Sequence, residues 1–121
     1  MKKKTILVVD DETDLLEIVK SHLEDAGYEI ITALGGREGL LSAKRVNPDL
    51  IILDIAMPDI GGFEVLENLR GQPEFFKKPV IMLTAQGQTA NIFEAERLRV
   101  VDFVIKPFTR EELLAAVRKS V

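Results

Sequence analysis

The sequence contains no cysteine and only one histidine, His22. The absence of cysteine excludes a disulfide framework and a thiolate metal site, and one histidine cannot build a histidine-rich metal cluster. No apolar run approaches the ~18 residues that a membrane span needs. The apolar stretch behind the basic residues 2–4 stops at Asp10, which is too short for a signal peptide. We therefore expect a cytoplasmic protein without a membrane partner.

Length, composition and net charge indicate the number of domains and the kind of ligand. A chain of 121 residues suggests one domain, residues 1–121, that is large enough to bury a core. Its 46% apolar and 30% charged residues are typical of a globular protein. The net charge of −4 argues against nucleic acid as a direct ligand.

Short apolar segments alternate five times with segments of helical periodicity. The expected strands cover residues 6–9, 28–33, 50–53, 80–83 and 101–105. This alternation predicts an α/β fold with a parallel sheet and helices on both of its faces. Right-handed crossovers then place the carboxyl ends of all strands on the same edge of the sheet.

The fourth and fifth helices carry more detailed expectations. The fourth is expected over residues 89–98, with Ala90, Phe93 and Leu98 as its apolar face. The last helix is expected behind Thr109, a candidate N-cap with Glu112 three residues further on.

Polar side chains close four of the five expected strands. In chain order, the strands end on Asp10-Asp11, Leu34, Asp54, Thr84 and Lys106. Sites in open parallel sheets form outside the carboxyl ends of the strands. If the first and third strands are neighbours, three carboxylates crowd together and require a cation among them. Lys106 and a divalent metal are both candidates, and oxygen ligands of this kind suit Mg²⁺.

Each of these residues also has a purely structural interpretation. Asp11 could be the N-cap of the first helix, and Glu12 and Asp14 could be first-turn acids that the helix dipole favours. Thr84 could cap the following loop, and Lys106 could be an exposed lysine. Their coincidence on one edge of the sheet favours a functional site.

Four motifs in order resemble the receiver domains of two-component response regulators. They are ILVVDDE (residues 6–12), LDIAMPD (53–59), LTA (83–85) and KPF (106–108). The resemblance covers nearly the whole chain. It implies a flavodoxin-like, doubly wound (βα)5 fold with strand order 2-1-3-4-5.

The resemblance also implies a function. Asp54 corresponds to the phosphoacceptor, which takes a phosphoryl group from a partner histidine kinase or phosphotransfer protein. Mg²⁺ is bound in this family by residues that match Asp11, Asp54 and the backbone carbonyl of Ala56, with Asp10 acting mainly through metal-bound water. The chain would be a switch that promotes its own phosphorylation and dephosphorylation, and not an enzyme with a separate substrate.

Further residues match the family's switching elements. Lys106 would pair with Asp54 at rest and with the phosphoryl group afterwards, and Thr84 would move its hydroxyl onto that group. Phe103 matches the aromatic residue whose rotamer follows Thr84, and the Lys106-Pro107 bond is cis in the family. The fourth helix, fifth strand and fifth helix would form the output surface for a downstream domain or protein. The resemblance is compatible with a monomer or a phosphorylation-dependent homodimer.

The sequence departs from the family pattern at several positions. Ala56 and Gln86 occupy positions that tune the lifetime of the phosphorylated state, and Gly61 stands where an acidic residue is common. The stretch from Arg99 to Val101 replaces a smaller Gly-Ala stretch, so the exit of the fourth helix should be bulkier.

Three other functions share some of these features with a receiver domain. A haloacid-dehalogenase-type phosphohydrolase shares the Asp, Thr, Lys and Mg²⁺ inventory, but it normally has a second carboxylate where this chain has Ala56. A flavin-binding electron carrier would need a phosphate loop where Asp10, Asp11 and Glu12 repel phosphate. A degenerate receiver would lack part of the acidic and lysine set that is present here.

Overall fold

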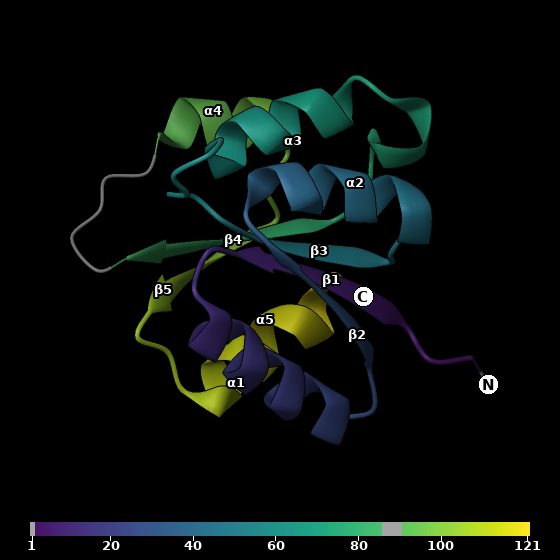
Figure 1. The fold of residues 1–121 in the computed structure, drawn as a ribbon, viewed down its shortest axis with the longest axis vertical. Coiled ribbons are helices and arrows are strands. Elements are labelled where there is room, and N and C mark those ends of the chain that lie inside the picture. Colours follow the sequence, from purple (N-terminus) through teal and green to yellow (C-terminus); the bar gives the residue numbers. More distant parts are fainter. Residues whose placement is uncertain (1, 86–90) are drawn as a thin grey trace.

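The computed structural model describes residues 2–85 and 91–121. Its five strands are β1 (Thr5–Asp10), β2 (Glu29–Leu34), β3 (Leu50–Asp54), β4 (Val80–Ala85) and β5 (Asp102–Lys106). They pair in parallel in the order β2-β1-β3-β4-β5 (Figure 1). The predicted parallel sheet and the implied strand order are both confirmed, and β1 and β3 are neighbours.

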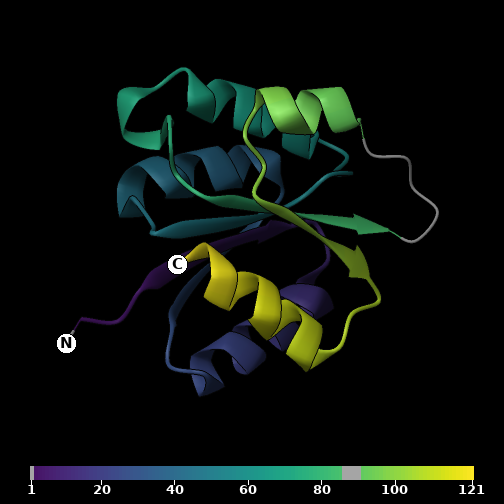
Figure 2. The same cartoon turned by 180° about the vertical axis from the view of Figure 1, so that it is seen from behind.

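The helices cover both faces of the sheet. They are α1 (Thr13–Asp25), α2 (Gly36–Val46), α3 (Gly62–Arg70), α4 (Ile92–Arg97) and α5 (Arg110–Ser120), with a short 3₁₀ helix, η1 (Pro73–Phe75). Helices α1 and α5 lie on one face, and α2, α3 and α4 lie on the other (Figure 1). The view from behind shows α5 beside α1 below the sheet (Figure 2).

The two helical layers enclose two apolar clusters. In β1, Ile6 and Val8 face α1 and α5, whereas Leu7 and Val9 face the layer of α2 and α3. All four side chains are at most 1% exposed. Strand β1 is therefore a continuous apolar run from Ile6 to Val9, because both faces of a parallel sheet are covered.

Local signals fix several helix ends. Helix α1 is followed by Gly27 at φ 100°, and α2 ends at Asn47 in the left-handed region. Both conformations are easiest for Gly and Asn. Helix α5 begins with the predicted capping box, in which Thr109 and Glu112 exchange hydrogen bonds.

The predicted apolar face of α4 was wrong at Phe93, which is 85% exposed. The buried residues of this region are Ala95 and Leu98. Helix α4 begins at Ile92, capped by Asn91, which accepts a hydrogen bond from the Glu94 N–H at 3.1 Å. Residues two positions apart point about 200° away from each other around a helix, so the helix that buries Ala95 turns Phe93 towards solvent. Ala90, the other residue assigned to this face, lies outside the described residues.

In the bulky segment that follows α4, Arg99 has a backbone conformation that is more usual for glycine. Arg99 has a φ of 58°, which is uncommon for a residue with a Cβ atom. Its guanidinium donates to the carbonyl of Phe76 at 2.9 and 3.2 Å and stacks over the Phe76 ring at 4.1 Å. These contacts hold a strained residue in place.

The buried guanidinium of Arg70 links α3 to two turns. It donates to four backbone carbonyls, those of Phe75, Lys78, Leu98 and Arg99, at 2.6–3.3 Å. Burial lowers the pKa of Arg70 to about 10, so the side chain stays charged at neutral pH. The end of α3, the η1 segment and the turn behind α4 therefore share one anchor.

Gly62 allows α3 to start directly against β3. A Cβ atom at this position would lie 2.3 Å from the carbonyl oxygen of Asp54 and 3.0 Å from the Cα of Ile55. Both neighbours are backbone atoms, so relief would require the loop after Asp54 to move.

We expect Gly62→Ala to lower the free energy of unfolding by about 2 kcal/mol, because overpacking against backbone forces it to shift. Gly71→Ala is the matched control, since its Cβ atom would meet the Asn68 oxygen at an ordinary 3.5 Å. The control should be neutral or slightly stabilising. Urea unfolding of both variants measures the difference, and equal stabilities would contradict the close approach seen at Gly62.

Candidate functional site

The amine of Lys106 joins the carboxyl ends of three strands. Its Nζ lies 3.0 Å from Asp10 Oδ2, 3.4 Å from Asp54 Oδ1 and 3.6 Å from Glu12 Oε1. The lysine side chain is 17% exposed, while those of Asp10 and Asp54 are 0% and 5% exposed. The structure thus brings together the end residues of β1, β3 and β5.

The pairing of Lys106 differs in detail from the expected one. The resemblance implied a resting pair of Lys106 with Asp54, but the shorter contact of the amine is its hydrogen bond to Asp10. Both carboxylates lie within ion-pair distance of the one amine. Asp10 also accepts a hydrogen bond from the Glu12 N–H at 3.0 Å.

Asp54 is held in a buried and negatively charged environment. Burial and the nearby charge of Asp10 raise the pKa of Asp54 to about 6, against the lowering effects of Lys106 and the Ala56 backbone. Burial likewise raises the pKa of Asp10 above its ordinary value. The ionised acids are therefore only partly compensated by the lysine.

The pKa of Lys106 is also shifted, but by its partners and not by burial. Burial by itself would lower its pKa, but the hydrogen bond with Asp10 and the charges of Asp10 and Asp54 outweigh burial. The pKa of Lys106 is consequently raised, and the amine is charged at neutral pH. One fixed positive charge serves two buried carboxylates.

A cluster of carboxylate oxygens could hold a metal ion beside this pair. Ligand atoms of Asp10, Asp11 and Glu12 all lie within 4.8 Å of one another. Oxygen donors with several open positions fit Mg²⁺, which keeps part of its water shell. Asp54 is outside this group of three and is connected to it through Lys106.

The structure changes the interpretation of two acidic residues. Asp11 is not the N-cap of α1, because that position belongs to Glu12, whose side chain makes no capping hydrogen bond. Glu12 was expected to be only a first-turn acid, yet its carboxylate lies in the cluster and near Lys106. The sequence signal that could have identified Glu12 is its position directly after the Asp10-Asp11 pair.

The remaining predicted residues are distributed over β4, β5 and the loops that follow the strands. Thr84 is buried near the end of β4, one position after the residue that pairs with Asp54. Phe103 is partly buried and packs in the layer of α2 and α3. The Lys106-Pro107 bond is cis. Ala56 is exposed in the loop after β3, and Gln86 lies outside the described residues.

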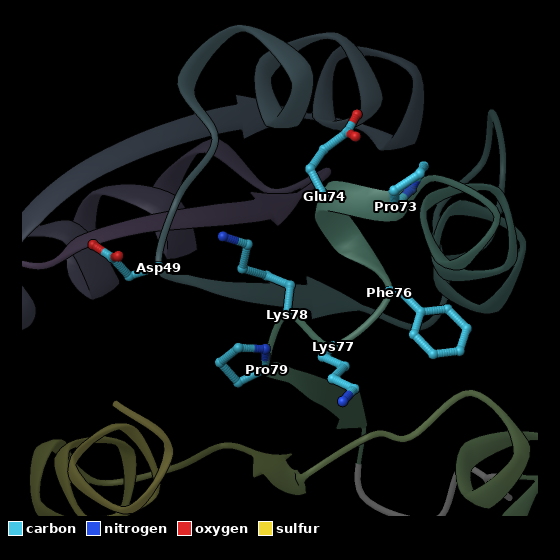
Figure 3. Close-up of a pocket in the computed structure, with 7 residues that line it drawn as sticks. All are labelled: Asp49, Pro73, Glu74, Phe76, Lys77, Lys78 and Pro79. Atoms are coloured by element: carbon cyan, nitrogen blue, oxygen red, sulfur yellow. The ribbon is translucent and has the colours of Figure 1, made fainter.

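The site does not coincide with the hollow drawn in Figure 3. That hollow, of about 450 Å³, is lined by Asp49, Pro73, Glu74 and residues 76–79. Asp49 precedes β3 and Pro79 precedes β4, so the hollow lies at the amino ends of these strands. The polar cluster lies at their carboxyl ends, where sites of open parallel sheets form.

The chain belongs to the response regulator receiver domain family, whose model matches residues 6–118. It is 40% identical over 115 residues to the alkaline phosphatase synthesis transcriptional regulatory protein PhoP of Bacillus subtilis, covering 95% of this chain and 47% of PhoP. The probable transcriptional regulator ycf27 of Cyanophora paradoxa is 40% identical over 118 residues, 98% of this chain and 48% of ycf27. The chain thus spans about half the length of these curated relatives.

Solved structures agree with this family. The chemotaxis protein CheY4 of Vibrio cholerae superposes with a TM-score of 0.92 at 34% identity, covering 99% of this chain and 100% of CheY4. The resemblance to receiver domains and the flavodoxin-like fold are therefore confirmed. None of the helices in the described part of the chain has the length and apolar character needed to cross a bilayer.

The pKa of Asp54 makes a prediction about stability. An aspartate with a pKa of about 6 in the folded chain and 3.8 when unfolded binds more protons when folded, so its ionisation destabilises the fold as pH rises through this window. Asp54→Asn should therefore raise the free energy of unfolding at pH 7 by about 2–3 kcal/mol. At about pH 3 and below, the gain should disappear, because Asp54 is then mostly protonated in both the folded and the unfolded state.

Urea unfolding at both pH values in the presence of EDTA measures this effect. Asp25→Asn, at an exposed position of α1, is the control for removing one negative charge. A gain for Asp54→Asn that is the same at both pH values would show that burial of the charge is not its cause.

Proposed function

We propose that this chain is a phosphoacceptor switch in which Asp54 receives a phosphoryl group from a phosphohistidine of a partner histidine kinase or phosphotransfer protein. The observation that carries the proposal is the shared amine: Lys106 Nζ lies 3.4 Å from Asp54 and 3.0 Å from Asp10. Two buried acids around one lysine, at the carboxyl edge of the sheet, form a site with more negative than positive charge.

The chemistry of the donors fits Mg²⁺ as the missing cation. Asp10, Asp11 and Asp54, with the backbone carbonyl of Ala56, would hold the ion, and Glu12 adds a carboxylate beside them. When bound, Mg²⁺ neutralises charge on phosphoryl oxygens, which is the main requirement of phosphoryl transfer.

The residues of the chain supply the nucleophile and its alignment. A carboxylate oxygen of Asp54 attacks phosphorus, the bond from phosphorus to the imidazole nitrogen breaks, and its electron pair stays on that nitrogen. With a pKa of about 6, Asp54 is mostly ionised at neutral pH and available for attack. The product is an acyl phosphate on Asp54, which burial in the sheet edge keeps close to Lys106.

The switch follows from the new charge. Phosphoryl oxygens compete with Asp10 for the Lys106 amine and accept a hydrogen bond from the hydroxyl of Thr84. The packing of Phe103 changes when Thr84 moves. The transition is a shift between two packings of α4, β5 and α5. Exposed apolar side chains on this side, Ile92 at 71% and Ile105 at 57% exposure, support its use as an output surface.

The partners follow from the same assignment. We propose a cytoplasmic protein that acts through its output surface on a downstream domain or protein, as a monomer or as a phosphorylation-dependent homodimer. Two relatives are named transcriptional regulators, which supports control of transcription as the output. The phosphohydrolase alternative gains no support, because the general-acid position is Ala56.

We expect the wild-type chain to gain the mass of one phosphoryl group from acetyl phosphate in the presence of Mg²⁺ and to lose it in hydroxylamine. Asp54→Asn should gain none, because the amide is not a nucleophile for this step. Intact-mass spectrometry measures both, with Asp49→Asn at the other edge of the sheet as a control. Equal phosphorylation of the Asp54→Asn variant would remove Asp54 from its role.

Lys106→Ala should still accept the phosphoryl group but should respond to it less, because the amine that contacts the new oxygens is gone. NMR chemical shifts of the Phe103 ring, measured before and after acetyl phosphate, report the response. Shifts equal to those of the wild type would show that Lys106 does not connect the acceptor to the output surface.

A further inference from the structure

Helix α2 begins without a cap of its own. Its N-cap residue is Gly35, which has no side chain to accept hydrogen bonds from the first turn. Asp59, in the loop after β3, accepts them instead: Oδ1 from the Gly36 N–H at 3.1 Å and Oδ2 from the Arg37 N–H at 2.9 Å. A carboxylate more than twenty residues away in sequence thus caps this helix.

These hydrogen bonds are made by the charged form of Asp59. The backbone N–H of Arg37 is the main cause that lowers the pKa of Asp59 to about 2. The bonds would be lost only as pH falls through that value. At neutral pH Asp59 is therefore ionised, and its carboxylate can accept both hydrogen bonds from α2.

The turn before α2 also contacts the end of β1. Gly35, at φ 90°, donates its N–H to the backbone carbonyl of Asp10 at 2.9 Å. Gly36 is packed against the same loop, since a Cβ atom there would lie 2.5 Å from Ile60 Cγ1 and 2.8 Å from the Ile60 oxygen. The turn thus lies between the backbone of Asp10 and the loop that follows Asp54.

The other part of this loop is fixed to the sheet. The Ile55 N–H donates to the Leu83 carbonyl at 3.0 Å, and the Gly62 N–H donates to the Ile55 carbonyl at 2.8 Å. Ala56 therefore lies in a loop with its ends closed at Ile55 and Gly62 and its middle held by Asp59. The position of the Ala56 carbonyl depends on all three contacts.

We propose that Asp59 is a positioning residue of the phosphoacceptor site. Asp59 ties residues 55–61 to the first turn of α2, and Gly35 at the start of that helix bonds to the backbone of Asp10. These contacts form a clamp that fixes the spacing between the Ala56 carbonyl and the acidic side chains. The inference rests on the proposed function, because it concerns the Mg²⁺ affinity of that site. Asp59 acts through the loop and does not itself contact the phosphoryl group.

The test measures Mg²⁺ binding to the chain by calorimetry, without any phosphodonor. Asp59→Ala removes the clamp, and Asp59→Asn removes the charge but keeps an amide oxygen that can accept a backbone hydrogen bond. Asp49→Ala is the matched control. Asp49 also accepts a backbone hydrogen bond, from the Thr5 N–H at 2.8 Å, but at the amino ends of the strands (Figure 3).

We expect Asp59→Ala to weaken Mg²⁺ binding by about tenfold, a typical effect of losing a residue that orients metal ligands. Asp59→Asn should weaken Mg²⁺ binding less than Asp59→Ala does, because its amide oxygen can still accept one of the two backbone hydrogen bonds. Asp49→Ala should lower the melting temperature without changing Mg²⁺ affinity, since it removes an equal charge and the same kind of bond far from the site.

Two results would overturn the inference. Asp59→Ala that binds Mg²⁺ like the wild type would show that the clamp does not position the loop. An Asp59→Asn variant that binds Mg²⁺ as weakly as the Asp59→Ala variant would show that the hydrogen bond kept by the amide oxygen does not position the loop. If the wild-type chain binds no Mg²⁺, the proposed metal site fails and this inference fails with it, whereas normal wild-type binding with an unchanged Asp59→Ala variant refutes only the inference.

Discussion

The ammonium group of Lys106 is shared by two carboxylates that the sheet buries, and the properties of the site depend on this unequal ratio. Strand β5 is separated from β1 by β4 and β3, yet Lys106 reaches Asp10 at 3.0 Å. The amine therefore crosses the carboxyl edge of the sheet above the end of β3. A site with more buried negative than positive charge attracts a cation, which is the electrostatic condition for the proposed binding of Mg²⁺.

This charge imbalance is tolerated because the rest of the sheet is strongly apolar. Ionised Asp54, with its pKa near 6, destabilises the fold by an amount of about 3 kcal/mol. Complete burial of one or two side chains such as Leu53 or Ile52 offsets a cost of this size. Proteins commonly retain such locally unfavourable arrangements where function requires them.

The sequence predicted the alternation of elements and the residues at the strand ends, since both follow from patterns within short segments. It did not predict which carboxylate would be nearer to Lys106, because that depends on side-chain reach across three strands. Phe93 was wrongly assigned to the buried face of α4, whereas Leu98 is buried as predicted, because a helix of six residues offers too few apolar positions to define its buried face. The capping of α2 by Asp59 was also missed, since a hydrogen bond between distant segments leaves no local pattern.

Within residues 2–85 and 91–121, the hydrogen bonds of Arg70 all go to main-chain oxygens, and this has a consequence for sequence variation. The carbonyls that it binds belong to Phe75, Lys78, Leu98 and Arg99, and every amino acid presents the same carbonyl. These hydrogen bonds therefore place no requirement of their own on the side chains at the four positions. At position 99, where the side chain lies outside the core, they are compatible with a large residue such as arginine.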